Sequence, residues 1–289
     1  MILQRIHMND FIKSSKSDNT ALCTFHDYSF AVANGALQVT VSDGPAADMV
    51  LIDTDTTLNE PLAVSGIARV HIAAGCTLTL AGGVSGTSSD TLVFTGPGTL
   101  VVEGSCDARI AVGEGTLSIA SAQSIAGGVA LSGGATLVAT ADVATSAPVE
   151  VLGPANVSAA AGCSLALNGT VAGSGSILAS GAGTVKVADA SGLAGGITIV
   201  GVMEFAAPPA TGPLRFAGGT FLYTGAADAA LDVPLEVLTS GNPGATIRTA
   251  PGAGSLDVFG PLWWSSSLYM HFFSAQGGEI VCRGGPMRK

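Results

Sequence analysis

The amino-acid sequence predicts an all-β protein built as a single-stranded parallel β-helix (a β-solenoid), with about ten coils of roughly 20 residues each. Two observations predict this fold: apolar and polar residues alternate in short stretches between glycine turns, and that unit recurs along the chain at a nearly constant interval. In residues 181–206, for example, Val185 and Val187 alternate with polar neighbours before a second glycine turn. Such alternation indicates strands with one buried face, and no helix tolerates so many glycines.

The residue that follows each glycine turn marks the start of a repeat. Ten such markers occur, and they are Thr77, Thr99, Thr116, Thr136, Ser164, Thr184, Val202, Thr220, Thr246 and Ser255. Successive markers are separated by 22, 17, 20, 28, 20, 18, 18, 26 and 9 residues, so all intervals but the last cluster near twenty. Two turn sequences, 73–80 and 160–167, are nearly identical. A unit of this length cannot bury a face alone, so neighbouring copies are expected to stack.

The markers also predict which side chains form the core. Successive side chains of a strand point to opposite faces, so the residue after each marker is expected to point inward. The predicted inward residues are Leu78, Leu100, Leu117, Leu137, Leu165, Val185, Met203 and Leu256. Ala166, which follows Leu165, is expected to face outward.

The sequence divides into three segments. Residues 35–258 carry the repeats, whereas residues 1–34 and 259–289 hold ten of the fifteen aromatic residues. The ends of a solenoid must cover an exposed core and unpaired strand edges, so we expect 1–34 and 259–289 to be caps. The pair Trp263-Trp264 has an alternative interpretation as a platform on which a sugar stacks.

Composition excludes several classes of function. A net charge of −10 leaves almost no counter-charge for phosphates, so no nucleic-acid partner is expected. Although 47% of residues are hydrophobic, no run approaches the 18 or so apolar residues of a spanning helix, so no direct membrane insertion is expected. The oligomeric state stays open.

The cysteines and histidines do not form the patterns of a metal or redox site. The five cysteines, Cys23, Cys76, Cys106, Cys163 and Cys282, include no C-x-x-C pair, and Cys76 and Cys163 hold equivalent turn positions. The four histidines, His7, His26, His71 and His271, are widely separated. Neither a metal site nor a cofactor site is expected, because no phosphate-binding or dinucleotide-binding motif is present either.

The carboxylates are dispersed along the chain rather than clustered. The nearest approach to a cluster is Asp53 and Asp55, whose side chains would share a face if that piece were a strand. We interpret them as part of a solvated polar face, with a calcium site or an acid/base pair as the alternative. No catalytic constellation is found, so an enzyme is not expected.

Residues 181–206 resemble the passenger-associated, or autotransporter-associated, β-strand repeat of bacterial surface proteins. Gly181, Gly183, Thr184, Val185 and Val187 match the opening of that repeat, Gly195-Gly196 its middle, and Gly201, Met203 and Phe205 its close. Other residues, Ser191 or Gly192 and Leu193, occupy the family's Asn and Tyr positions. A shortened copy lies at 96–104 with 110–119, and 218–225 is similar to a segment that accompanies such repeats.

The resemblance implies a right-handed β-helix stalk on a secreted or bacterial cell-surface protein. Two features depart from that family: the first residues lack the apolar core of a secretory signal, and residues 259–289 are too few for a barrel translocator. We expect a non-enzymatic structural or adhesive solenoid whose partners are host or cell-surface glycans or proteins. The alternatives are a carbohydrate-active or carbohydrate-binding β-helix, such as a polysaccharide lyase or tailspike-like protein, and a piece of a larger passenger.

Overall fold

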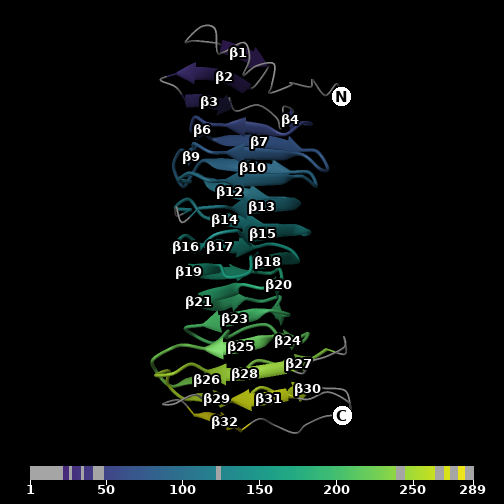
Figure 1. The fold of residues 1–289 in the computed structure, drawn as a ribbon, viewed down its shortest axis with the longest axis vertical. Helices are drawn as coiled ribbons and strands as arrows, with labels where there is room; N and C mark the ends of the chain where they lie inside the picture. Colours follow the sequence, from purple (N-terminus) through teal and green to yellow (C-terminus); the bar gives the residue numbers. More distant parts are fainter. Residues whose placement is uncertain are drawn as a thin grey trace. The chain divides into compact units, whose positions relative to one another are not determined.

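The computed structural model describes residues 22–25, 28–33, 36–41, 49–121, 125–238, 245–263, 270–273 and 279–283. It confirms the predicted fold class, because every described element is a β-strand and parallel strands about 20 residues apart stack in a β-solenoid of about ten turns. The chain divides into two compact units, residues 1–137 and 138–289, which we call unit 1 and unit 2. Most of their strands are labelled in Figure 1. Phe11, Trp264, Tyr269, His7 and His26 lie outside the described residues.

Unit 1 contains three sheets that the chain visits in turn. The first comprises β4 (Val50–Ile52), β7 (Ile67–Ile72), β10 (Thr91–Thr95), β12 (Arg109–Val112) and β14 (Val129–Leu131). The second comprises β5 (Thr56–Leu58), β8 (Thr77–Leu80), β11 (Thr99–Val102), β13 (Gly115–Ile119) and β15 (Ala135–Ala139), whose last two residues belong to unit 2. The third comprises β1 (Leu22–Phe25), β2 (Tyr28–Ala33), β3 (Ala36–Val41), β6 (Leu62–Ser65) and β9 (Val84–Ser85).

The third sheet of unit 1 is antiparallel at one end and narrows to isolated bridges at the other. Strands β1, β2 and β3 pair antiparallel, whereas β3 pairs with β6 in parallel. Strand β2 therefore occupies the edge of β3 opposite β6. Capping by residues 1–34 stays a prediction. Beyond β9 the sheet narrows to single bridges between Val84, Cys106 and Ile125.

Unit 2 also contains three sheets. The largest comprises β16 (Val143–Thr145), β17 (Val149–Val151), β19 (Ser164–Gly173), β21 (Thr184–Leu193), β23 (Val202–Phe205), β25 (Thr220–Tyr223), β28 (Ala245–Thr249) and β31 (Met270–Phe273). The second comprises β18 (Ala155–Ala159), β20 (Ile177–Ser180), β22 (Ile197–Ile199), β24 (Leu214–Phe216), β27 (Leu235–Val237) and β30 (Leu262–Trp263). The third comprises β26 (Ala229–Leu231), β29 (Leu256–Val258) and β32 (Ile280–Cys282).

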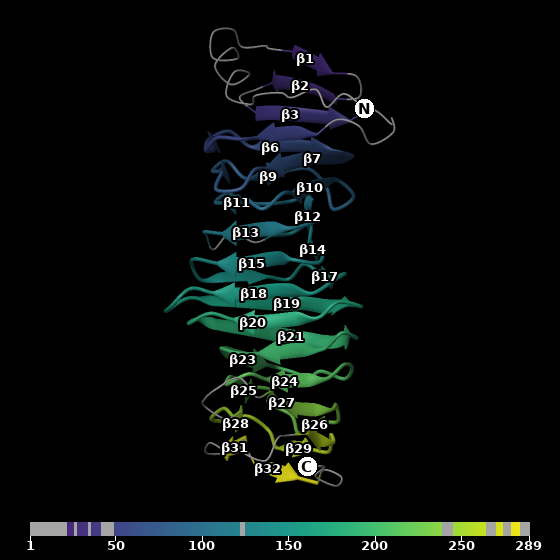
Figure 2. The ribbon, with the colours of Figure 1, turned by 90° about the vertical axis from the view of Figure 1, so that its right-hand side faces the viewer.

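The long strands β19 and β21 each span two faces of a coil. Val143 of β16 pairs with Leu165, near the start of β19, whereas Val149 of β17 pairs with Val171, near its end. The register between β19 and β21 shifts after Leu167. Such an irregularity bends a strand, which lets one strand turn a corner without a loop. Figure 2 shows the strands of unit 2 stacked from β18 to β32.

Within each unit, the markers predicted from the sequence occupy equivalent positions on neighbouring strands, on the second sheet of unit 1 and on the largest sheet of unit 2. In unit 1, Thr99 pairs with both Thr77 and Thr116. In unit 2, an unbroken register joins Ser164, Thr184, Val202, Thr220 and Thr246. Ser255 differs from these, because it precedes β29 on another sheet of the same coil, which explains its short interval.

The core confirms the predicted orientations. All eight predicted inward side chains are at most 1% exposed, and Ala166 is half-exposed. The five aromatic residues between the two end segments are also buried: Phe94, Phe205, Phe216, Phe221 and Tyr223. Phe205 and Phe221 stack, with ring centroids 4.6 Å apart and an interplanar angle of 15°. Each such side chain contributes about 1.5–3 kcal/mol through burial.

The two nearly identical turn sequences form the same turn. The N–H of Cys76 donates to the carbonyl of Ala73 at 3.1 Å, and that of Cys163 donates to Ala160 at 2.9 Å. The glycine before each cysteine has a φ of +75° or +78°, which the third position of a type II turn requires. Both thiols are free and half-buried beside the turn.

Candidate functional site

Asp53 and Asp55, the closest pair of carboxylates noted in the sequence, do not lie on one strand. Both are exposed in the connection between β4 and β5, so the condition under which they would share a strand face is not met. Asp55 Oδ1 accepts a hydrogen bond of 2.8 Å from the N–H of Thr77, the first residue of β8 in the next coil. Asp55 thus has a structural partner one coil away.

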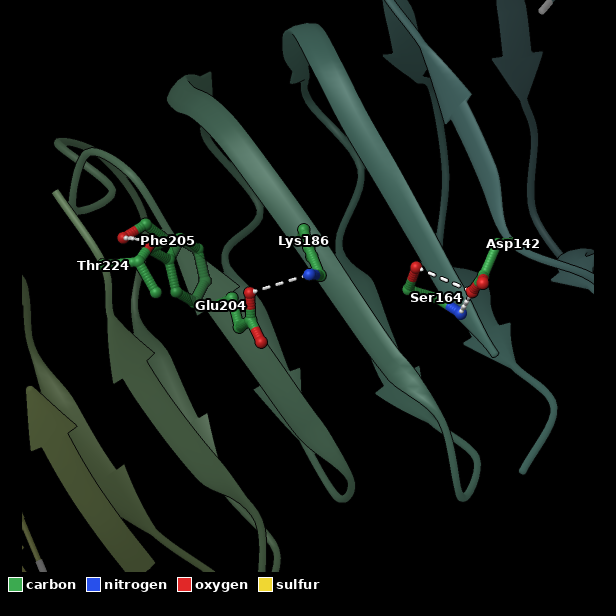
Figure 3. Close-up of polar contacts among 6 residues, drawn as sticks. All are labelled: Asp142, Ser164, Lys186, Glu204, Phe205 and Thr224. Carbon is green, nitrogen blue, oxygen red and sulfur yellow. Dashed lines mark hydrogen bonds and ion pairs between the residues drawn. The ribbon is translucent and has the colours of Figure 1, made fainter. Parts of the chain in front are cut away.

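The same contact recurs at two further places. Asp142 Oδ1 accepts hydrogen bonds from the N–H and the hydroxyl of Ser164, at 2.8 and 3.0 Å (Figure 3). Asp228 Oδ1 accepts one from the N–H of Ser255 at 2.7 Å. We call Asp55, Asp142 and Asp228 the inter-coil aspartate caps. Each holds the N–H of a marker residue in the following coil, at the point where a strand begins.

Asp90 makes a related contact in a tight loop of unit 1. Its Oδ1 accepts a hydrogen bond from the N–H of Gly66, and its Oδ2 accepts from the N–H and hydroxyl of Thr87, all at 2.7 Å. The hydroxyl of Thr87, together with the two backbone N–H groups, lowers the pKa of Asp90. Charge-assisted bonds of this kind favour the ionised carboxylate.

Asp189 makes a local contact within β21. Its Oδ1 accepts a hydrogen bond of 2.9 Å from the N–H of Ser191, and the backbone and side chain of Ser191 together lower the pKa of Asp189. The hydroxyl of Thr211 donates to the carbonyl of Ser191 at 2.8 Å. A general acid needs a pKa raised towards neutrality, which is the opposite direction from that of Asp90 and Asp189.

Three of the ion pairs among the described residues also join neighbouring coils. Lys186 Nζ lies 3.4 Å from Glu204 Oε2 on the adjacent strand, and Figure 3 shows this pair beside the bond from Thr224 to the carbonyl of Phe205. The other two pairs are Arg215 with Glu236 at 2.8 Å and Arg283 with Asp257 at 3.1 Å. Exposed pairs contribute about 0–1 kcal/mol each. Their positions again link one coil to the next.

The described residues contain no group of three or more His, Cys, Asp or Glu side chains that could hold a metal ion. His71 lies on β7 in unit 1, whereas His271 belongs to β31, of which only the backbone is described. Cys106 is buried and its thiol donates to the carbonyl of Ala108 at 3.1 Å. Burial, and then the charge of Asp107, raise the pKa of Cys106 to about 12. Cys106 therefore has the character of a packed core residue rather than a nucleophile.

A shallow depression of about 450 Å³ lies on the outer face of β26, β29 and β32. Its lining residues are Asp228, Ala229, Ala230, Ser255, Asp257, Glu279, Val281 and Arg283. Two of its three carboxylates already have partners, because Asp228 holds the N–H of Ser255 and Asp257 pairs with Arg283. The depression is therefore polar but largely satisfied within the protein.

Trp263 is the described member of the tryptophan pair considered as a sugar platform. It lies at the end of β30 and is 43% exposed, and its Cα partner on β27 is Glu236. The depression on β26, β29 and β32 belongs to a different sheet from Trp263. The choice between a cap and a platform stays a prediction.

Sequence reasoning identified the marker residues but missed the inter-coil aspartate caps. A signal for two of them was present, since Asp55 and Asp142 each lie 22 residues before the marker that follows a Gly-Cys turn. That spacing becomes meaningful only once the coil length is known.

Among the described residues, no helix is long and apolar enough to cross a membrane. No protein-family model, curated protein or solved structure matches this chain.

Proposed function

We propose that this protein is a non-enzymatic structural or adhesive β-solenoid, which displays rows of side chains on a stack of coils. The proposal is carried by one observation: several described acidic residues make structural contacts between coils. Asp55, Asp142 and Asp228 hold strand-starting N–H groups, and Glu204 and Glu236 pair with cations of adjacent strands. These carboxylates stabilise the stacking of coils.

The chemistry of glycan cleavage argues in the same direction. Hydrolysis needs two carboxyl groups facing each other across a bond, about 5–9.5 Å apart, and one of them must hold a proton near neutral pH. The caps lie in separate coils, each with a backbone partner. The carboxyls of Asp90 and Asp189 hold their protons less readily than usual because their pKa values are lowered.

A stack of parallel coils suits a partner with a repeating structure. Every outward position is repeated on the next coil at a separation of about 4.8 Å, so one side chain type per position becomes a row. Weak contacts along a row add up when the partner repeats as well. The autotransporter-like repeat at 181–206 favours display outside a bacterial cell, where glycans or proteins of other cells would be the partners.

Carbohydrate binding is the second candidate, and Trp263, a residue that is 43% exposed, favours it. An exposed aromatic ring can stack on the apolar face of a sugar but offers no carboxyl group for cleavage. A single tryptophan therefore supports sugar binding rather than catalysis.

Incubation with pectins, alginates and mucin-type glycans, with and without calcium, tests the proposal. We expect no new reducing ends and no unsaturated sugars. Asp55→Asn and its matched control Asp142→Asn alter the same kind of cap in different units. Turnover that Asp55→Asn abolishes and Asp142→Asn retains would establish an enzyme and overturn the proposal.

A further inference from the structure

The second sheet of unit 1 presents a regular uncharged surface. One outward row consists of Thr77, Thr99 and Thr116, which are Cα partners on β8, β11 and β13. The neighbouring row, two residues further along each strand, consists of Thr57, Thr79, Val101 and Ser118. We call these seven residues the threonine face.

The hydroxyl groups of the threonine face are available to a ligand. Among the described residues, the hydroxyls of Thr57, Thr77, Thr79, Thr99 and Thr116 have no protein partner. The only cap beside these rows, Asp55, uses Oδ1 to hold the N–H of Thr77.

Ser118 gives an independent indication that the face binds something polar. It is only 8% exposed, and its hydroxyl has no protein partner within the described part of the chain. A buried hydroxyl without a partner costs about 1–3 kcal/mol unless water or a ligand satisfies it. Ser118 lies beside Val101 and is recessed compared with half-exposed Thr116, so a water molecule held there would be positioned by the sheet.

The geometry of the face sets the kind of ligand. Neighbouring strands lie about 4.8 Å apart, and residues i and i+2 of a strand lie about 6.6–6.8 Å apart, so the hydroxyls and methyls form a two-dimensional grid. The branched Cβ of threonine and valine restricts χ1, which keeps that grid rigid. The strand spacing is close to the repeat of water oxygens in the basal plane of hexagonal ice.

Other repeating ligands fit the face less well. Strands β5, β8, β11 and β13 carry no aromatic residue on which a sugar ring could stack, and no charged residue that could hold an ionic polymer. Water is different, because it needs only hydroxyls as anchors and methyls that leave its remaining hydrogen bonds undisturbed.

We propose that the threonine face binds ordered water, and specifically the surface of an ice crystal. The inference rests on the proposed adhesive role, since it names a surface to which the solenoid would adhere. The rigid sheet has already lost the entropy that flexible hydroxyls would lose on binding, and several weak contacts then act together.

The test measures ice shaping and thermal hysteresis with the full chain and three variants. Thr79→Lys and Thr99→Lys place a long charged side chain in the middle of the two rows. Thr91→Lys is the matched control, since Thr91 begins β10 in the same coil, is also half-exposed, and belongs to the first sheet. Circular dichroism establishes that each variant is folded.

We expect faceted ice crystals and hysteresis with the wild-type chain and with Thr91→Lys, and a fall to buffer level with Thr79→Lys and Thr99→Lys. Unshaped ice with the wild-type chain, or shaping that survives both face variants, overturns the proposal. If the protein sediments with insoluble cellulose or chitin, and Thr99→Lys abolishes this, the face binds a glycan instead and the ice-binding proposal is overturned. None of these outcomes bears on glycan turnover, so failure here and failure of the proposed function are distinguishable.

Discussion

Replacing Leu165 by Asp tests the register of the whole repeat. Leu165 is fully buried in β19, where its Cα partners are Val143 on β16 and Val185 on β21. Loss of the leucine side chain costs about 2–5 kcal/mol, judged by leucine-to-alanine changes in cores. A carboxylate buried there without a partner adds several kcal/mol or takes up a proton. The sum is comparable to the whole stability of a typical domain, about 5–15 kcal/mol.

Ala166→Asp is the matched control at the next position. Ala166 is half-exposed and pairs with Lys186 across β19 and β21, so the new carboxylate would face water and a cation. We expect the free energy of unfolding to change by no more than about 1 kcal/mol, because strand propensity opposes the substitution and a cross-strand charge pair favours it. Urea denaturation followed by circular dichroism measures both variants, with Leu165→Ala in reserve should Leu165→Asp fail to fold. Equal losses of stability at positions 165 and 166 would refute the register.

Two further predictions concern acid and the C-terminal segment. Because the pKa of Asp90 is lowered in the folded state, its contribution to stability is present above the unfolded-state pKa of about 3.9 and is lost as the pH falls through the lower folded-state pKa. The Tm of Asp90→Asn should therefore lie below that of the wild type at pH 7 and approach it in strong acid. A difference in Tm that does not change with pH would contradict the assignment. Deletion of 259–289 should leave the remaining coils folded but self-associating through an uncovered edge, as size-exclusion chromatography would detect; a folded, monomeric truncation would contradict capping at this end.

The sequence predicted the coils well because their determinants are local. A glycine with positive φ, such as Gly75 or Gly162, is needed wherever the type II turn occurs, and alternation then sets which neighbour is buried. That chain of reasoning identified Leu78 and Leu165 as core residues from a few positions each.

Contacts between coils were harder to predict because they depend on where the chain returns. Nothing within five residues of Asp142 indicates Ser164 as its partner, and the antiparallel pairing of β2 with β3 is equally invisible to a period-two pattern. The long interval from Thr136 to Ser164 includes the complete strands β16, β17 and β18, one face more than the next interval. Irregular intervals of this kind carry no local signal.

The aspartate caps have a consequence for how the chain folds and how it could have grown. Asp55 and Asp142 lie 142 − 55 = 87 residues apart, which is also the separation of Cys163 and Cys76 in the turns that they serve, 163 − 76 = 87. In both cases cap and turn form a cassette whose two parts are one coil apart, and the contact can close as soon as the following coil is made. Folding can then proceed from any coil to its neighbour, with loops that never need to be longer than one repeat. Duplicating or deleting a cassette would lengthen or shorten the protein while leaving every remaining contact of the same kind.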